Sequence, residues 1–134
     1  MFRLGEKMDR VKARGLNPVV LAFVGDAVYS LFVREKLAFI SDKKSGELNK
    51  LAVAQVKATA QAEFYSRVKT LFTEEENDIF RRARNAKKNT RAKSATVSEY
   101  NISTGLEAVL GYLYIVGDTD RLNFILNQGN TDEL

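Results

Sequence analysis

Two acidic residues stand inside apolar, helix-forming stretches of this sequence. Asp26 interrupts the run LAFVGDAVY at residues 21–29, and Glu107 interrupts GLEAVLGYLY at residues 105–114. A buried carboxylate without a partner is costly, so each acid either lies at the solvated edge of its helix or has a partner. A solvated edge is the commoner reason for a single acid in an apolar helix, whereas two facing carboxylates need a cation between them.

A glycine accompanies each of these acids. Gly25 precedes Asp26, and Gly111 follows Glu107 by about one helical turn. Glycine inside a helix costs about 1 kcal/mol relative to alanine, so both positions indicate tight packing against another backbone. If the two helices cross there, Asp26 and Glu107 converge. A carboxylate pair that holds a metal ion is therefore one hypothesis, and two unrelated edge acids are the other.

Two absences from the composition limit the chemistry of any site. The sequence contains no cysteine and no histidine. Disulfides, thiol catalysis, histidine-based triads and the usual zinc ligands are therefore excluded. A metal site would have only oxygen ligands, and such ligands favour Mg²⁺ or Mn²⁺.

The positive charge of the chain is concentrated in one segment. The net charge is +4, yet RRARNAKKNTRAK (residues 81–93) holds seven Lys or Arg and no acid, and the remainder has 14 basic and 17 acidic residues. The segment is either a solvated loop or a surface for phosphate groups. It contains no aromatic residue, which favours the backbone of a double helix over stacked single-stranded bases. The candidate RNA-binding side chains are Arg81, Arg82, Arg84, Asn85, Lys87, Lys88, Arg91 and Lys93.

Helical periodicity and capping residues predict an all-α protein. The length of 134 residues fits a single domain over residues 1–134. Asn17 and Pro18 predict a helix start, followed by a largely buried helix to residue 39. Its expected buried stripe is Val20, Phe23, Val24, Ala27, Val28, Leu31 and Phe32.

Further helices are expected along the rest of the chain. One long helix is predicted over residues 48–72, and Thr73 with Glu76 forms a capping box that opens the next helix toward Arg84. Residues 89–101 lack periodicity and are expected to form a loop. A helix is expected to resume near Ser98–Ser103 and to carry residues 103–117, and Asp118 caps a short final helix. No segment alternates with period two for long enough to predict a sheet.

Four segments of this sequence, taken in order, resemble the catalytic domain of ribonuclease III, and in particular its short branch, mini-ribonuclease III. They are FVGDAV, FTEEE, RRARNAKK and STGLEAVLGYLY. The resemblance spans residues 17–117. It implies a homodimeric, all-helical endonuclease without a double-stranded-RNA-binding domain. Such an enzyme hydrolyses phosphodiesters of double-stranded RNA with Mg²⁺ and leaves 5′-phosphate and 3′-hydroxyl ends. By position, Asp26 matches the signature aspartate and Glu107 the later metal-binding glutamate.

The resemblance also implies a substrate and a location. Enzymes of the short branch trim precursor large-subunit ribosomal RNA in bacteria, and the chain shows no signal peptide or membrane helix, so a cytoplasmic enzyme is expected. The alternative is a catalytically inactive helical RNA-binding or ribosome-assembly protein of the same fold. Its argument is that Val19, Ala22 and Thr104 stand where full-length relatives carry acids. A helical adaptor with no RNA affinity is a third, more distant alternative.

Overall fold

The computed structural model describes residues 6–40, 42, 44–88 and 95–131. All regular elements in these ranges are helices, which confirms the all-α prediction. They are α1 (Arg10–Arg14), α2 (Pro18–Ile40), α3 (Ser45–Val56), α4 (Ala58–Val68), the 3-10 turn η1 (Lys69–Leu71), α5 (Glu74–Asn85), α6 (Val97–Ile115) and α7 (Thr119–Gly129). Within the described part of the chain, no helix has the length and apolar character needed to cross a membrane.

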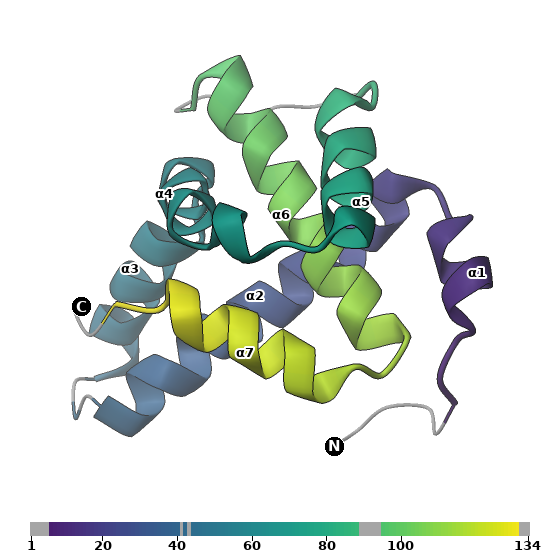
Figure 1. Cartoon of the computed structure of the whole chain (residues 1–134). Coiled ribbons are helices and arrows are strands. Elements are labelled where there is room, and N and C mark those ends of the chain that lie inside the picture. The colour runs from purple at the N-terminus through teal and green to yellow at the C-terminus, as the bar shows by residue number, and fades with distance from the viewer. Residues whose placement is uncertain (1–5, 41, 43, 89–94, 132–134) are drawn as a thin grey trace.

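Helix α6 is the centre of the fold, and the other long helices pack around it (Figure 1). Helix α2 crosses it, α4 and α5 lie against it on different sides, and α7 packs against α4 and α6. Most side chains of α6 from Ser103 to Leu113 are buried, in keeping with a helix that is surrounded by others. The chemistry-bearing residues of α6 are therefore fixed by the core of the protein.

The crossing of α2 and α6 is a contact between two backbones. A Cβ atom at Gly25 would collide with the carbonyl group of Glu107, and one at Gly111 would collide with the carbonyl oxygen of Leu21. Only glycine allows the helices to approach this closely. The tight packing expected at Gly25 and Gly111 is confirmed.

Local capping signals predicted three helix starts correctly. Asn17 Oδ1 accepts a hydrogen bond from the backbone N–H of Val19 at 2.9 Å, directly before α2. Thr73 caps α5 with the predicted capping box, and Asp118 caps α7. A further capping box, formed by Thr96 and its partner three residues later, starts α6 at Val97. The loop predicted to reach residue 101 therefore ends earlier, and its residues 89–94 lie outside the described ranges.

The single helix predicted over residues 48–72 is wrong, because the structure has two helices with a break at Lys57. The backbone of Lys57 is extended, with φ −67° and ψ 160°, and it ends α3 and precedes α4. The carbonyl oxygen of Val56 at this break accepts a hydrogen bond from Gln61 Nε2 at 2.8 Å. A side chain of α4 thus stabilises the break, so a periodicity that runs on through alanines and glutamines does not reveal it.

The buried face predicted for α2 is also wrong. The residues of α2 that face the core are Leu21, Ala22, Gly25, Tyr29, Val33 and Leu37. Four members of the predicted stripe are exposed instead: Ala27, Val20 by 48%, Phe23 by 79% and Leu31 by 47%. Helix α2 is apolar nearly all round, so its spacing could not identify which face packs against α6.

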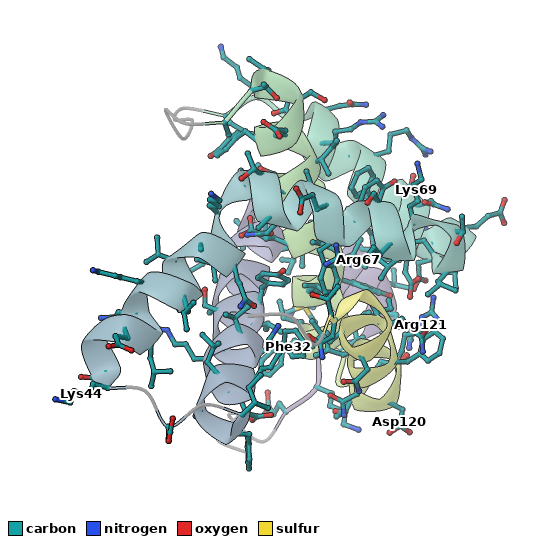
Figure 2. All side chains as sticks on the ribbon, turned by 90° about the vertical axis from the view of Figure 1, so that its left-hand side faces the viewer. Phe32, Lys44, Arg67, Lys69, Asp120 and Arg121 are labelled. Atoms are coloured by element: carbon teal, nitrogen blue, oxygen red, sulfur yellow. The ribbon has the colours of Figure 1, made fainter. Side chains whose placement is uncertain are left out.

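Two arginines attach α7 to its neighbours (Figure 2). Arg121 donates from Nη2 to Glu76 Oε1 at 2.7 Å, and this glutamate is almost fully buried. Arg67, on α4, donates from Nε to the carbonyl oxygen of Gly129 at 2.8 Å. These contacts join α7 to α4 and α5.

We predict that Gly25→Ala destabilises the protein by about 2 kcal/mol or more, because the added methyl group forces the backbones of α2 and α6 apart. The matched control is Gly46→Ala in α3, where an added Cβ meets nothing within 4 Å. That change should be neutral or stabilising by up to about 1 kcal/mol. Urea unfolding followed by circular dichroism measures both. Equal stabilities of the two variants would contradict the crossing.

Candidate functional site

The crossing of α2 and α6 brings Asp26 and Glu107 to one cleft of about 1250 Å³. Asp26 follows Gly25 on α2, and Glu107 supplies the carbonyl group that Gly25 touches, so the glycine contact sets the positions of both acids. The cleft is completed by residues around the start of α4 and by the end of α5. The two acids predicted to converge therefore lie in one cleft, as the glycines beside them indicated.

The two acids differ in their exposure to solvent. Asp26 is exposed, so the expected solvated edge describes this residue correctly. Glu107 is only partly exposed and stands among fully buried neighbours on α6. One carboxyl group thus faces water while the other is held in the wall of the cleft.

Burial raises the pKa of Glu107 to about 8. A hydrogen bond from Gln61 opposes this by lowering the pKa, and the neighbouring Asp26 carboxylate raises it further. The largest cause of the raised pKa is burial, because a low-dielectric setting disfavours the charged form of a carboxyl group. At neutral pH Glu107 is therefore largely protonated, and a cation that binds there must displace its proton.

Gln61 was not identified from the sequence, yet it is the residue that holds Glu107. Its side chain is 2% exposed, and its Nε2 donates to Glu107 Oε2 at 3.1 Å as well as to the carbonyl oxygen of Val56. A glutamine in an alanine-rich helix carries no signal of such a role. Its importance follows only from the break at Lys57, which brings the start of α4 to α6.

The donor set of the cleft fits a small hard cation. Asp26 and Glu107 offer carboxylate oxygens, and in the described part of the chain no third acid joins them to form a larger metal-binding group. The cleft is also lined by Val19, Ala22 and Thr104, none of which offers a carboxylate. Mg²⁺ is commonly held by one or two carboxylates, with the remaining positions filled by water and substrate phosphates. Two carboxylates are sufficient for this type of binding.

Part of the basic segment borders the same cleft. Arg82, Lys87 and Lys88 line it, as does Lys57, which the sequence gave no reason to single out. Lys88 lies just after α5 and caps its end, since its Nζ donates to the carbonyl oxygens of Arg84 and Ala86. Burial lowers the pKa of Lys88. Positive charge therefore lies on the rim of the cleft, with Lys87 exposed to solvent.

Among the other predicted RNA-binding residues, Arg81, Arg84 and Asn85 are described by the structure and do not line the cleft. Arg81 pairs with Asp78, which also binds Arg82 at 3.2 Å, so an acid one turn before the segment neutralises part of its charge. Arg84 donates to Asn85 Oδ1 and stands over the ring of Phe80. Arg91 and Lys93 fall outside the described residues.

The family profile and the named relatives of this chain point to the same family. The family profile described as "Ribonuclease III domain" matches residues 19–118. The chain is 50% identical to the mini-ribonuclease 3 of a Thermoanaerobacter species, over 90% of this chain and 85% of that protein. It is 41% identical to the mini-ribonuclease 3 of Clostridium tetani, over 93% and 83%. A crystal structure of a Fusobacterium nucleatum protein matches with a TM-score of 0.76 at 33% identity, over 85% of this chain and 91% of that one.

The raised pKa of Glu107 predicts a pH-dependent stability. Between its ordinary value of 4.5 and about 8, the folded protein keeps a proton that the unfolded chain has released. The stabilisation is complete at low pH and is lost as the pH rises through about 8. Glu107→Gln removes this dependence. The free energy of unfolding of the variant should therefore rise relative to that of the unaltered protein across this pH interval, by a few kcal/mol at its upper end.

Urea unfolding at a series of pH values, with a chelator present, measures this difference. Added Mg²⁺ should narrow it by stabilising the unaltered protein alone, because ligands that bind the folded state raise its stability. Parallel stability curves for the two proteins between the two pKa values would contradict the assignment.

Proposed function

The chain belongs to the ribonuclease III family, and on this premise we propose that it is a metal-dependent endoribonuclease that cleaves double-stranded RNA. The observation that carries the proposal is the convergence of Asp26 and Glu107 in one cleft with a basic rim. A site without histidine or cysteine needs another source of a nucleophile at neutral pH. Mg²⁺ or Mn²⁺ supplies it by lowering the pKa of water and by polarising the scissile phosphate.

In this proposal Asp26 and Glu107 hold the cation. Glu107 gives up its proton on binding and becomes the second carboxylate ligand, which places an added negative charge where the cation needs it. Water then attacks the phosphorus atom and releases a proton to the solvent, and the bond between phosphorus and the 3′ oxygen breaks. The 3′ oxygen takes a proton and leaves as a hydroxyl, while the phosphate remains on the 5′ end.

The basic rim is proposed to bind the RNA backbone. Arg82 and Lys87 border the cleft that holds the two acids, so phosphates that contact them lie close to the cation site. Contacts of this kind position a duplex without reading its bases. Arg81, Arg84, Asn85, Lys88, Arg91 and Lys93 remain candidates for contacts further along the RNA.

We also propose that the enzyme is a homodimer that uses the exposed apolar face of α2. Val20, Phe23 and Leu31, with Ala27 between them, follow helical spacing on one side of α2 and are exposed. An apolar stripe of this size on a surface helix indicates a protein partner. A second copy of the chain would cover it with its own α2, and a two-fold pair would offer one site to each strand of a duplex.

The resemblance to the short branch supports two finer proposals. The substrate is precursor large-subunit ribosomal RNA, and the enzyme works in the cytoplasm. The curated relatives at 50% and 41% identity carry the name mini-ribonuclease 3, which supports an assignment to this branch.

Cleavage of long double-stranded RNA is the direct test. The purified protein should cut it with Mg²⁺ and not with a chelator, and Asp26→Asn and Glu107→Gln should each lose activity by about a hundredfold or more, because each removes a carboxylate ligand. Products resolved on a gel and probed for terminal phosphate give the readout. RNA that is bound but left uncut by the unaltered protein would instead support the inactive RNA-binding alternative.

The proposed dimer interface has its own test. Phe23→Glu should convert the protein to a monomer, because it places a charge in the centre of the covered stripe. Phe39→Glu is the matched control, since Phe39 is 82% exposed and Phe23 79%, yet Phe39 lies off the stripe near the end of α2. Sedimentation velocity should show a dimer for the control and the unaltered protein. A dimer of Phe23→Glu would refute the use of this face.

A further inference from the structure

Gln61 is a buried amide whose two ends are in different situations. Both hydrogens of Nε2 are used, one toward Glu107 Oε2 and one toward the Val56 carbonyl oxygen. Because the Val56 carbonyl oxygen can only accept, it determines the orientation of the amide, and the oxygen cannot take the place of the nitrogen. Oε1 is buried and has no hydrogen-bond partner in the protein.

An unpartnered buried amide oxygen is unfavourable by itself, and its position next to the acids suggests what satisfies it. The nitrogen and oxygen of one amide are about 2.3 Å apart, so Oε1 lies within about 5.5 Å of Glu107 Oε2. Gln61 also lines the cleft that Asp26 and Glu107 share. Mg²⁺ keeps several waters when it binds, and a water bound to a cation at Glu107 could donate a hydrogen bond to Oε1.

We infer that Gln61 is a positioning residue of the cation site, which fixes the Glu107 carboxylate through Nε2 and offers Oε1 to the hydration shell of the cation. The inference rests on the proposed function, because it presupposes that Asp26 and Glu107 hold the cation. It accounts for a cleft in which the described residues include only two acids, because a neutral amide supplies the orientation and an extra oxygen without adding charge.

The break between α3 and α4 supports the inference independently. The extended Lys57 places the start of α4 at the cleft and exposes the Val56 carbonyl oxygen, which then holds Nε2. With one hydrogen bond anchored on backbone, the amide has little freedom, so the Glu107 carboxylate is held in one orientation. Polar partners of metal ligands act in this way, and their loss typically weakens metal binding by roughly tenfold to a hundredfold.

The test is Mn²⁺ binding to the full chain without RNA, measured by the electron paramagnetic resonance of free Mn²⁺ at a series of pH values. Gln61→Leu should weaken Mn²⁺ binding by roughly tenfold to a hundredfold. It should also move the pH midpoint of binding upward, because the hydrogen bond from Gln61 lowers the pKa of Glu107. Gln61→Met, which keeps the length of the side chain, is measured in parallel so that a folded variant without the amide is available.

The matched control is Gln55→Leu. Gln55 is a second glutamine with a buried, unpartnered side-chain atom, but it lines a different cavity, to which neither Asp26 nor Glu107 contributes. Its substitution should leave both the affinity and the pH midpoint unchanged. Thermal melts of all variants confirm that each is folded.

The outcomes separate the inference from the proposed function. If the unaltered protein binds Mn²⁺ and Asp26→Asn abolishes binding, the proposed cation site stands. If Gln61→Leu and Gln61→Met then match the unaltered protein in affinity and midpoint, the inference alone is overturned, and Oε1 is satisfied by an ordinary buried water. If the unaltered protein does not bind Mn²⁺, or Asp26→Asn has no effect, both are overturned.

Discussion

The contact between the backbones of α2 and α6 is the constraint on which the site depends. At Gly25 and Gly111 the missing side chains allow carbonyl groups of one helix to touch the other helix directly. Asp26 adjoins the first glycine, and Glu107 provides a carbonyl group in the same contact. The backbone positions of the two acids are therefore set by this rigid contact, which is the preorganisation that the proposed cation site needs.

The unequal burial of the two acids follows from the same crossing. Glu107 lies on the central helix, where burial raises its pKa to about 8, and Asp26 lies on the outer side of the contact and is exposed. Two fully exposed carboxylates would bind a cation weakly, and two fully buried ones would lose their charge. The arrangement lies between these limits, so Glu107 is available as an anion once a cation offsets the cost of its ionisation.

Local signals in the sequence predicted what depends on local structure. Asn17, Thr73 and Asp118 marked helix starts correctly because a cap is made by residues within one turn. The break at Lys57 was missed because a side chain from the following helix stabilises it, and Gln61 was missed because its role exists only once α4 meets α6. The pairing of Asp26 with Glu107 was one hypothesis because each has a glycine close by in sequence. A glycine inside a helix indicates close contact with a distant backbone, so a local pattern here predicted a long-range contact.

The error over α2 has a physical cause that bears on function. A helix that is apolar nearly all round is expected to be buried, yet only the face containing Leu21 and Tyr29 packs against the core. The face with Phe23 is exposed, and Asp26 faces the cleft. One helix thus presents an apolar face to the core, an acid to the site and a second apolar face to solvent. In the proposed dimer that second face is also buried. Packing within one chain explains only one apolar face of α2, and the dimer interface explains the other.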